Sequence, residues 1–285
     1  MKNLTALSFE LRKDVLDMIM SGKTGHIGGD MSVMDILTVL YFKQMHVNPV
    51  NPEDPDRDRL ILSKGHSVEA YYAVLAAKGF LDRREVIETF SQFGSPYIGH
   101  PNNKLPGIEM NSGSLGHGLS VSVGMALAGK MDRRDYRVYT VLGDGEMAEG
   151  SVWEAIMAAG HYKLDNLCAV VDRNRLQISG STEDVMAQDC QEERWKSFGW
   201  HVISAEGNDI QALDAAFEAA KKIKGQPTVV VARTVKGYGS ALMENQAVWH
   251  HKVPSEEEYR QICKDFEIRK EALLHEQDCK QTGNL

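Results

Sequence analysis

The chain has 285 residues, of which 42% are hydrophobic and 25% charged, the balance of a globular protein with a substantial core. Its formal net charge of −8 argues against a nucleic-acid-binding surface, which is usually basic. No apolar run approaches the roughly 18 residues of a membrane span, and the N-terminus has no signal-peptide core. The four cysteines form no CxxC pair, which favours reduced thiols. We therefore expect a cytoplasmic protein with neither a membrane nor a nucleic-acid partner.

The N-terminal part is predicted to be helical. Apolar residues at helical spacing predict an amphipathic helix over residues 8–21. A glycine-rich loop is expected over 21–29, and a second helix over 31–42. The proline-rich, charged segment 48–59 is typical of an exposed connection.

The middle of the chain combines one short strand with a long irregular stretch. We expect an apolar strand at 60–63 and an alanine-rich helix at 67–79. Glycine, proline and asparagine recur throughout residues 91–113, and a loop of that length inside a compact domain is more often functional than not. Residues 115–130 are predicted to form a small-residue helix suited to tight packing.

From residue 137 onward, strand and helix patterns alternate, which predicts a parallel sheet with right-handed crossovers. The expected strands cover 137–142, 167–172, 201–205 and 228–232, and the expected helices cover 151–162 and 210–223. The chain after Lys252 is charged and helical, so it is expected to be a peripheral tail. The predicted fold class is α/β, with a three-layer, mainly parallel sheet and helices on both faces, in a single domain over residues 1–285.

Polar residues gather where three of these strands end. GDGEMAEG follows the strand at 137–142, DRNRLQISG begins at 172, and KGH follows the strand at 60–63. Ligands of open parallel sheets bind at such carboxyl ends. Asp144 and Asn174 would offer oxygen ligands from two sides, which suits Mg²⁺ or Ca²⁺ rather than zinc. Two side chains are too few for a protein-only site, so the pair predicts a metal-bridged phosphate, with a backbone N–H approaching it at Gly145.

A dinucleotide site fits this stretch less well. GDGEMAEG is not GxGxxG, and an aspartate in the glycine turn would repel a pyrophosphate that carried no metal. Taken alone, such a turn is as easily structural as functional. The asparagine at the next strand end is what favours the metal.

The spacing of GDG and Asn174, with 28 residues between them, resembles the thiamine diphosphate motif. The surrounding stretches resemble transketolase, specifically its N-terminal diphosphate-binding domain. They occur in family order over about 230 residues. The matching stretches are TGHIGG (24–29), LSKGH (62–66), IGHP (98–101), SGSLGHG (112–118), GDGEMAEGSVWEA (143–155), DRNRLQISG (172–180), TVKGYG (234–239) and WHHK (249–252).

The resemblance implies a thiamine-diphosphate-binding fold and a set of roles. Asp144, the Asn174 side chain and the Leu176 carbonyl would bind the Mg²⁺ or Ca²⁺ ion. Glu149 would link two cofactor sites through a subunit interface. The residues implied to contact or border thiamine diphosphate are His66, Gly113, Leu115, Gly145 and Asn174. The residues implied to line the channel and meet the sugar hydroxyls, as catalytic groups, are His26, His100 and His250.

The chemistry of histidine supports part of this assignment. His26, His66 and His100 lie in glycine- or proline-containing loops, where functional side chains are often exposed. Ketol transfer removes a proton from a hydroxyl and returns one, and an imidazole can do both. The remaining histidines without a family role are better explained as surface or packing residues: His46, His161, His201 and His275.

Two positions depart from the family pattern. His251 stands where many relatives have glycine, so His250 is the better match for the channel histidine and His251 the alternative. His117 stands where full-length members often carry glutamine, near the cofactor.

The family also needs a glutamate that hydrogen-bonds the aminopyrimidine ring, and this residue lies in a second, pyrimidine-binding domain. Only 33 residues follow Lys252, too few for such a domain. The resemblance therefore predicts the N-terminal subunit of a split transketolase. A C-terminal partner subunit would complete each site, in a heterotetramer. The helix at 115–130 and the segment after Glu149 are candidate interface surfaces.

The predicted activity is transfer of a two-carbon ketol unit from a ketose phosphate to an aldose acceptor, as in the pentose phosphate pathway. Alternatives are a deoxyxylulose-phosphate synthase-like protein, a 2-oxo acid dehydrogenase component, or a transketolase variant for sulfonated or branched sugars. A non-catalytic cofactor-binding module is a further alternative. Three channel histidines favour handling of sugar hydroxyls over pyruvate-type decarboxylation. The full set of metal ligands argues against the non-catalytic module.

Overall fold

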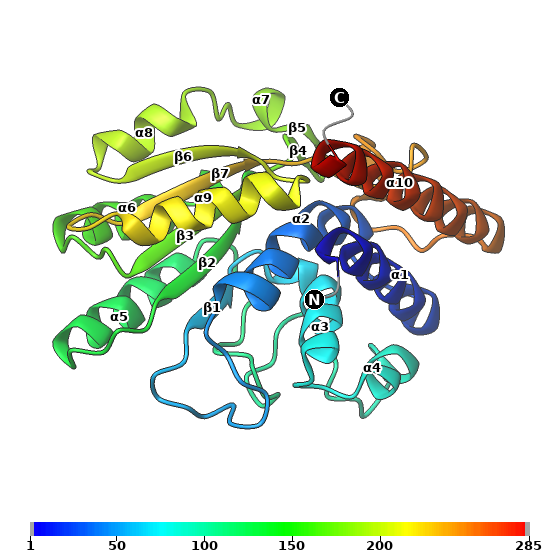
Figure 1. The fold of residues 1–285 in the computed structure, drawn as a ribbon, viewed down its shortest axis with the longest axis horizontal. Helices are drawn as coiled ribbons and strands as arrows, with labels where there is room; N and C mark the ends of the chain where they lie inside the picture. The colour runs from blue at the N-terminus through cyan, green and yellow to red at the C-terminus, as the bar shows by residue number, and fades with distance from the viewer. Residues whose placement is uncertain (1–2, 283–285) are drawn as a thin grey trace.

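A five-stranded parallel sheet forms the middle layer of the molecule (Figure 1). The computed structural model describes residues 3–282, with side chains described as far as residue 279. The strands lie in the order β1-β2-β3-β7-β6, and every neighbouring pair is parallel. Their bounds are β1 Arg59–Leu62, β2 Val138–Gly143, β3 Leu167–Arg173, β6 His201–Glu206 and β7 Thr228–Arg233. A separate antiparallel hairpin joins β4 Leu176–Gln177 to β5 Gly180–Ser181.

Helices cover both faces of this sheet, as predicted for a three-layer α/β fold. In chain order they are α1 Leu4–Gly22, α2 Ile27–Val39, α3 Val68–Lys78, α4 Arg83–Thr89, α5 Gly118–Met131, α6 Gly150–His161, α7 Thr182–Val185, α8 Gln191–Ser197, α9 Ile210–Lys222 and α10 Glu256–Thr282. A π-helical turn at Leu40–Gln44 extends α2, and short 3₁₀ turns lie at Gly65–Ser67, Gly145–Ala148 and Ala247–His250.

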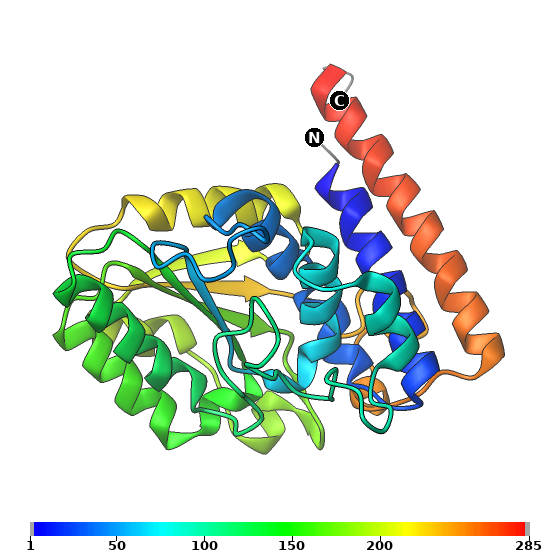
Figure 2. The same cartoon turned by 90° about the horizontal axis from the view of Figure 1, so that it is seen from below.

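The alternation of side chains along the strands divides the interior into two cores. Tyr139 and Val141 of β2 belong to the core beneath α1, α2, α3 and α9. Val138 and Leu142 point the other way, into the core beneath α5, α6 and Trp195 of α8. Figure 2 shows the sheet edge-on between α9 on one side and α5 and α6 on the other. Because both faces are covered, the strands read as nearly continuous apolar runs.

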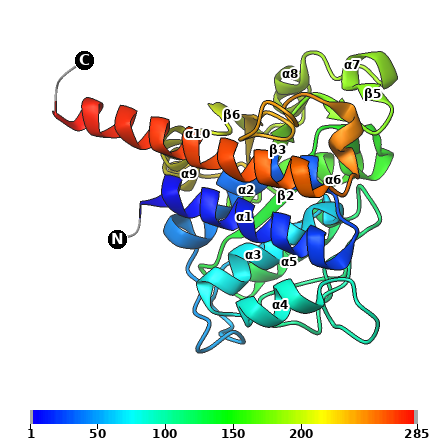
Figure 3. The same ribbon diagram turned by 90° about the vertical axis from the view of Figure 1, so that its right-hand side faces the viewer.

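The charged C-terminal segment is helical, as the sequence predicts, and lies at the periphery. α10 runs beside α1, and the pair extends past the sheet (Figures 2 and 3). Ile262 and Phe266 of α10 are buried, and most of its exposed residues are polar or charged. None of the helices in the described part of the chain is long and apolar enough to cross a membrane.

The glycine-rich loop predicted over residues 21–29 is wrong at both ends, because α1 continues through Gly22 and the connection covers only residues 23–26. α2 begins at Ile27, so Gly28 and Gly29 are helical. A Cβ on Gly28 would lie 2.7 Å from the Trp249 carbonyl oxygen, and one on Gly29 would lie 2.8 Å from Ser67 Oγ. These glycines therefore allow close packing of a helix, a role that sequence alone does not distinguish from loop formation.

Other boundaries also shifted. α5 starts at Gly118 rather than 115, because Gly113 and Gly116 have φ values of 142° and 83° that a helix cannot include. The sequence patterns did not indicate the short helices α4, α7 and α8 or the β4–β5 hairpin, which are too short to show a periodic pattern.

Candidate active site

The register of the sheet brings the predicted site residues to one edge. Gly143 at the end of β2 pairs with Asp172 of β3, which pairs with Ala232 of β7. The turn after β1 carries His66, and the segment after β7 carries Lys236. Four strand ends therefore deliver their following residues to the same place, the usual ligand-binding edge of a parallel sheet.

A cavity of about 340 Å³ opens at this edge. It collects every predicted metal, cofactor and catalytic residue except Glu149. The lining residues are His26, Gly29, Lys64, His66, His100, Gly113, Leu115, Gly143, Asp144, Gly145, Glu146, Asn174, Leu176, Gln177, Ile178, Ser179, Lys236 and His250. Glu149 is instead exposed at the N-terminus of α6, and His117 is exposed at the N-terminus of α5.

Asp144 is a buried carboxylate at the start of the turn after β2, 2% exposed. Its oxygens accept hydrogen bonds from the backbone N–H of Gly145 at 2.8 Å and of Arg175 at 2.5 Å. Burial, together with the nearby charge of Asp172, raises the pKa of Asp144 to about 6. A carboxylate whose charge is disfavoured in this way is poised for a cation.

The other two predicted ligands present oxygens to the same cavity. Asn174 Oδ1 accepts a hydrogen bond from the Leu176 N–H at 3.1 Å, which places the side-chain and main-chain oxygens of this turn together. The Leu176 carbonyl accepts a hydrogen bond from Lys236 Nζ at 3.1 Å, so this oxygen already faces a positive charge. Within the described residues, no group of three or more His, Cys, Asp or Glu side chains could hold a metal ion. A metal here would need oxygens from a ligand, as the sequence implies.

His26 lies at the centre of a cluster of five imidazoles. Its ring centroid lies 5.4 Å from that of His66, 6.1 Å from His100, 5.7 Å from His250 and 4.7 Å from His251. These residues come from segments that are far apart in sequence, and only the fold assembles them.

The two neighbouring histidines of the WHHK stretch both reach the cluster, in different positions. His250 lines the cavity, and its Nδ1 lies 2.9 Å from Lys236 Nζ. His251 is exposed beside the cavity, with Nε2 3.3 Å from Thr24 Oγ1. His250 therefore lines the cavity, whereas His251 lies at its edge against His26.

Burial keeps the four imidazoles that line the cavity neutral. Desolvation and nearby positive groups lower the pKa of His26 to about 4 and that of His250 to about 3. They also lower the pKa of His66 well below its usual value, and desolvation lowers that of His100. A neutral imidazole carries one N–H donor and one acceptor nitrogen, so each ring can both give and take a hydrogen bond from a hydroxyl.

Two lysines in the cavity were missed as site residues, although both stand inside the stretches LSKGH and TVKGYG. Lys64, 2% exposed, forms an ion pair with Asp172 at 2.5 Å. Burial, with the charge of Lys64 next, lowers the pKa of Lys236 to about 8. Two ammonium groups at the floor of one cavity favour an anionic ligand such as a phosphate.

Glu146, the second acid of GDGEMAEG, was also missed. It is buried and accepts hydrogen bonds from Ser63 Oγ, from the Gly116 N–H at 2.7 Å and from the Gly143 N–H at 3.0 Å. It thereby joins the turns after β1 and β2 to the loop that carries Gly113 and Leu115. Its role is structural support of the cavity wall, which sequence adjacency to Asp144 does not reveal.

At two positions in the cavity wall, a glycine leaves space that a side chain would fill. A Cβ on Gly113, which has φ of 142°, would lie 3.1 Å from the His100 ring. A Cβ on Gly145 would lie 3.2 Å from the Gln177 side chain. The backbone of both turns can therefore approach a ligand that a larger residue would hold away.

Known proteins with similar sequences point to one family. The family model described as the transketolase thiamine diphosphate binding domain matches residues 5–280. An apulose-4-phosphate transketolase subunit of Phocaeicola vulgatus is 48% identical over 269 residues, covering 94% of this chain and 95% of that protein. A 6-deoxy-6-sulfo-D-fructose transketolase subunit of Clostridium sp. is 40% identical over 258 residues, covering 90% of this chain and 94% of that protein.

Solved structures give a similar result. The Campylobacter jejuni transketolase aligns with a TM-score of 0.87 at 30% identity, over 92% of this chain and 42% of that one. The Leishmania mexicana transketolase aligns with a TM-score of 0.85 at 28% identity, over 99% of this chain and 46% of that one. The chain thus spans nearly the full length of the two separate subunits but less than half of these solved transketolases.

Proposed function

The chain belongs to the transketolase family, whose thiamine-diphosphate-binding domain it matches, and we propose that it is the N-terminal subunit of a split transketolase. With its partner it transfers a two-carbon ketol unit from a ketose phosphate to an aldose acceptor. The observation that carries this proposal is the single cavity shared by four histidines, two lysines and the oxygens of Asp144, Asn174 and Leu176. We regard residues 1–285 as one diphosphate-binding domain.

Thiamine diphosphate is the cofactor that this cavity fits. Its diphosphate would lie against Gly145, His66 and the lysines, because they supply a close backbone approach and positive charge. Gln177 Oε1 on the same wall is buried with no hydrogen-bond partner among the described residues, so a donor from a ligand would satisfy it. Gly113 and Leu115 would border the rings, and Leu115, 39% exposed, offers an apolar side chain to them.

The metal is Mg²⁺, or Ca²⁺ in its place, held by Asp144, the Asn174 side chain and the Leu176 carbonyl. All three line the cavity, and all three ligands are oxygens. Lys236 donates to the Leu176 carbonyl, so a cation at this oxygen is favourable. The metal would replace that ammonium contact and free Lys236 for the diphosphate.

The histidines of the cavity handle protons and hydroxyls. Bound thiamine diphosphate supplies the carbanion chemistry that breaks and forms the carbon–carbon bond. His26, His100 and His250 hold the substrate's hydroxyls, and a neutral ring among them takes a hydroxyl proton and later returns it. Their lowered pKa values keep an acceptor nitrogen available throughout the neutral pH range. His251, beside His26 at the cavity's edge, is the alternative to His250.

A partner subunit completes the site. Within the described residues, no Glu other than Glu146 lines the cavity, and all of its hydrogen bonds are used to hold loops of this chain. The glutamate for the aminopyrimidine ring would therefore come from a C-terminal subunit with a pyrimidine-binding domain. Relatives that are themselves named as transketolase subunits, matched over nearly their full length, support this division. We propose a heterotetramer of two such pairs, with Glu149 and the outer face of α5 at its interfaces.

The choice of sugar belongs to the same proposal. The relatives include subunits named for apulose 4-phosphate, a branched sugar, and for 6-deoxy-6-sulfo-D-fructose. The identity of 48% to the former makes apulose 4-phosphate the first donor to test, beside xylulose 5-phosphate and fructose 6-phosphate of the pentose phosphate pathway. Cys168, Cys190 and Cys263 form no disulfide, which supports the proposed cytoplasmic location.

Reconstitution tests this function. The chain is purified alone and together with the product of the adjacent gene, and each preparation is assayed for ketol transfer with thiamine diphosphate, Mg²⁺ and the three donors. Transfer by the complex and none by the isolated chain is expected. Activity of the isolated chain would overturn the split enzyme, and a stable complex that binds the cofactor without transferring any sugar would favour the non-catalytic module.

A further inference from the structure

Two helix N-termini meet directly behind the His26–His66 pair. His26 is the residue before α2, and His66 lies in the turn that leads into α3. The first turn of α2 carries Asp30, and the first turn of α3 carries Glu69. Both side chains are 0% exposed, an unusual place for two carboxyl groups.

Each carboxyl group accepts a hydrogen bond from a backbone N–H at the start of the other helix. Asp30 Oδ1 accepts a hydrogen bond from the Ala70 N–H in the first turn of α3, at 3.0 Å. Glu69 Oε1 accepts one from the His26 N–H at the start of α2, at 3.2 Å. Neither His26 nor Ser67 caps its own helix with a side chain, so the two acids satisfy amide groups that the helices leave open.

In the described part of the chain, the second oxygen of each carboxyl group lacks a hydrogen-bond donor, which a shared proton would supply. These crossed hydrogen bonds bring the two carboxyl groups to the same pair of helix ends, and a side-chain hydrogen bond between them contributes to the pKa of each. Asp30 Oδ2 and Glu69 Oε2 are nevertheless buried, and no donor among the described residues reaches them. One proton held between these oxygens gives both a partner, whereas two adjacent buried carboxylates would repel each other. The single remaining negative charge lies at two helix N-termini, where it is favoured.

We propose that Asp30 and Glu69 share one proton and act together as positioning residues that fix His26 in the sugar channel. The proposal rests on the proposed function only in giving His26 a role toward the substrate. The shared proton itself does not depend on that role, because every group that holds it belongs to this chain.

The packing around Gly25 explains why the position of His26 depends on this pair. Gly25 has φ of 153°, and a Cβ there would lie 2.6 Å from Glu69 Oε1 and 2.5 Å from Ile19. The loop therefore passes tightly over the carboxyl group and is held to it by the His26 amide. The ring that follows lies among four other imidazoles, so a small shift of the loop would move the centre of the cluster.

The charged and titratable groups around the pair are consistent with one retained proton. Burial raises the pKa of both Asp30 and Glu69, and the charge of Glu69 raises that of Asp30 further. Lys64 acts in the opposite direction on Asp30, but its ammonium is committed to Asp172. Tyr72 of α3 and the rings of His26 and His66 complete the titratable surroundings, and burial lowers the pKa of both histidines, so they bring no opposing charge.

The first test detects the proton in the isolated chain. Infrared difference spectra at pH 7, wild type minus Glu69→Gln and wild type minus Asp30→Asn, should each show the carbonyl band of a protonated carboxylic acid. The matched control Glu53→Gln changes an exposed glutamate and should show only loss of a carboxylate band. Loss of only a carboxylate band from both buried variants would overturn the shared proton.

The second test uses thermal stability. Because the folded pair has raised pKa values, its contribution to stability is lost as pH rises from the carboxyl range through the folded values. Glu69→Gln has no shared proton to lose, and its amide can still accept from His26 and donate to Asp30. Its melting temperature relative to wild type should therefore rise between pH 5 and pH 9, whereas that of Glu53→Gln should not. A constant difference for Glu69→Gln would contradict the proposal.

The third test separates positioning from packing. In Glu69→Leu the His26 amide loses its acceptor, so its hydrogen exchange should accelerate, and kcat in the reconstituted complex should fall at least about tenfold. Glu69→Gln should rescue both readouts to within about threefold of wild type. Equal losses in Gln and Leu variants would overturn positioning of His26. If the wild-type complex transfers no sugar, the proposed function fails, while the exchange and infrared results still decide this inference.

Discussion

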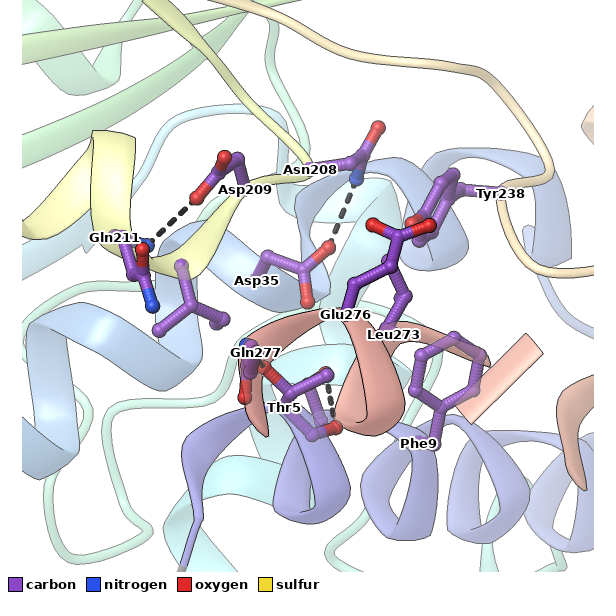
Figure 4. A pocket seen from close by; sticks show the side chains of 12 residues that line it. Thr5, Phe9, Asp35, Asn208, Asp209, Gln211, Tyr238, Leu273, Glu276 and Gln277 are labelled. Carbon is purple, nitrogen blue, oxygen red and sulfur yellow. Dashed lines mark hydrogen bonds between the residues drawn. The ribbon is translucent and has the colours of Figure 1, made fainter. Parts of the chain in front are cut away.

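Two buried ion pairs lie in regions of the molecule with different tasks. Arg12 of α1 binds Asp35 of α2 through two hydrogen bonds, at 3.1 and 2.6 Å. Asp35 also accepts from Asn208 Nδ2 at 2.9 Å, beside a small cavity of about 80 Å³ between α1, α9 and α10 (Figure 4). Lys64 and Asp172 form the second pair, in which Lys64 lines the cavity of about 340 Å³ at the sheet edge. The first pair holds two helices together, and the second places charged groups beside a cavity.

The difference lies in what surrounds each pair. Arg12 also donates to Ser8 Oγ and the Met31 carbonyl and packs on the rings of Phe9 and Tyr238, so its neighbours belong to the scaffold. Lys64 faces a space lined by Asp144, Lys236 and the histidines, where burial shifts several pKa values. A buried ion pair is therefore not a sign of function by itself. Several groups with shifted pKa values that face one open cavity are a better indication of a functional site.

The largest expected effect is on cofactor binding and comes from a substitution in the cavity. Asp144→Ala should weaken Mg²⁺-dependent binding of thiamine diphosphate at least about 100-fold, because losing a ligand costs more than losing an outer-shell partner. Isothermal titration with the purified complex measures this. Because the Gly145 and Arg175 N–H groups lose their acceptor in this variant, its melting temperature is measured as a control for folding. Retained affinity would refute the metal assignment.

Replacing the aspartate of each ion pair by asparagine compares the two regions directly. Asp35→Asn leaves the Arg12 guanidinium buried without a carboxylate, and should lower the free energy of unfolding by about 3–5 kcal/mol. Urea denaturation measures the loss, and cofactor affinity per folded molecule should be unchanged. Asp172→Asn should cost less stability, because Lys64 can turn toward the cavity, but should weaken cofactor binding. Identical profiles for the two variants would show that the distinction is wrong.

Within the cavity, a histidine can be removed without removing the cofactor. His100→Asn should lower kcat about 100-fold, the scale of one general acid–base group, with little change in cofactor affinity. Steady-state kinetics with xylulose 5-phosphate measures the effect, and His161→Asn on the exposed end of α6 is the matched control. A loss of cofactor binding that parallels the loss of kcat would assign His100 to the cofactor instead.

The smallest expected effect concerns pH. Burial lowers the pKa of His26 from 6.5 to about 4, so the folded ligand-free chain binds fewer protons than the unfolded chain between these values. Stability should fall as pH falls through this window. His26→Gln should make the fall shallower, measured as the free energy of unfolding in urea at pH 7, 6 and 5. His161→Gln should keep the wild-type slope; if His26→Gln also keeps it, the imidazole is not desolvated.

Much of the site was predictable because its residues stand in short, chemically unusual stretches. Asp144 lies in a glycine turn after an apolar run, and Asn174 follows the next such run, so parallel-sheet topology alone predicts that they meet. Lys64 and Lys236 were overlooked although they lie inside the same stretches, because a lysine beside a glycine gives no indication of burial. Asp30 and Glu69 gave no signal, since each looks like an ordinary acid in the first turn of a helix.

The sequence by itself determined the α/β alternation, the sheet edge at which ligands bind and the oxygen ligands of the proposed metal, because periodicity and turn chemistry are local properties of the chain. Only the tertiary structure decided which charges are buried together: Lys64 with Asp172, Asp30 with Glu69, and His26 with four other imidazoles. These groups come from segments far apart in the chain. Their protonation is set by desolvation and neighbouring charge, which exist only once the chain has folded.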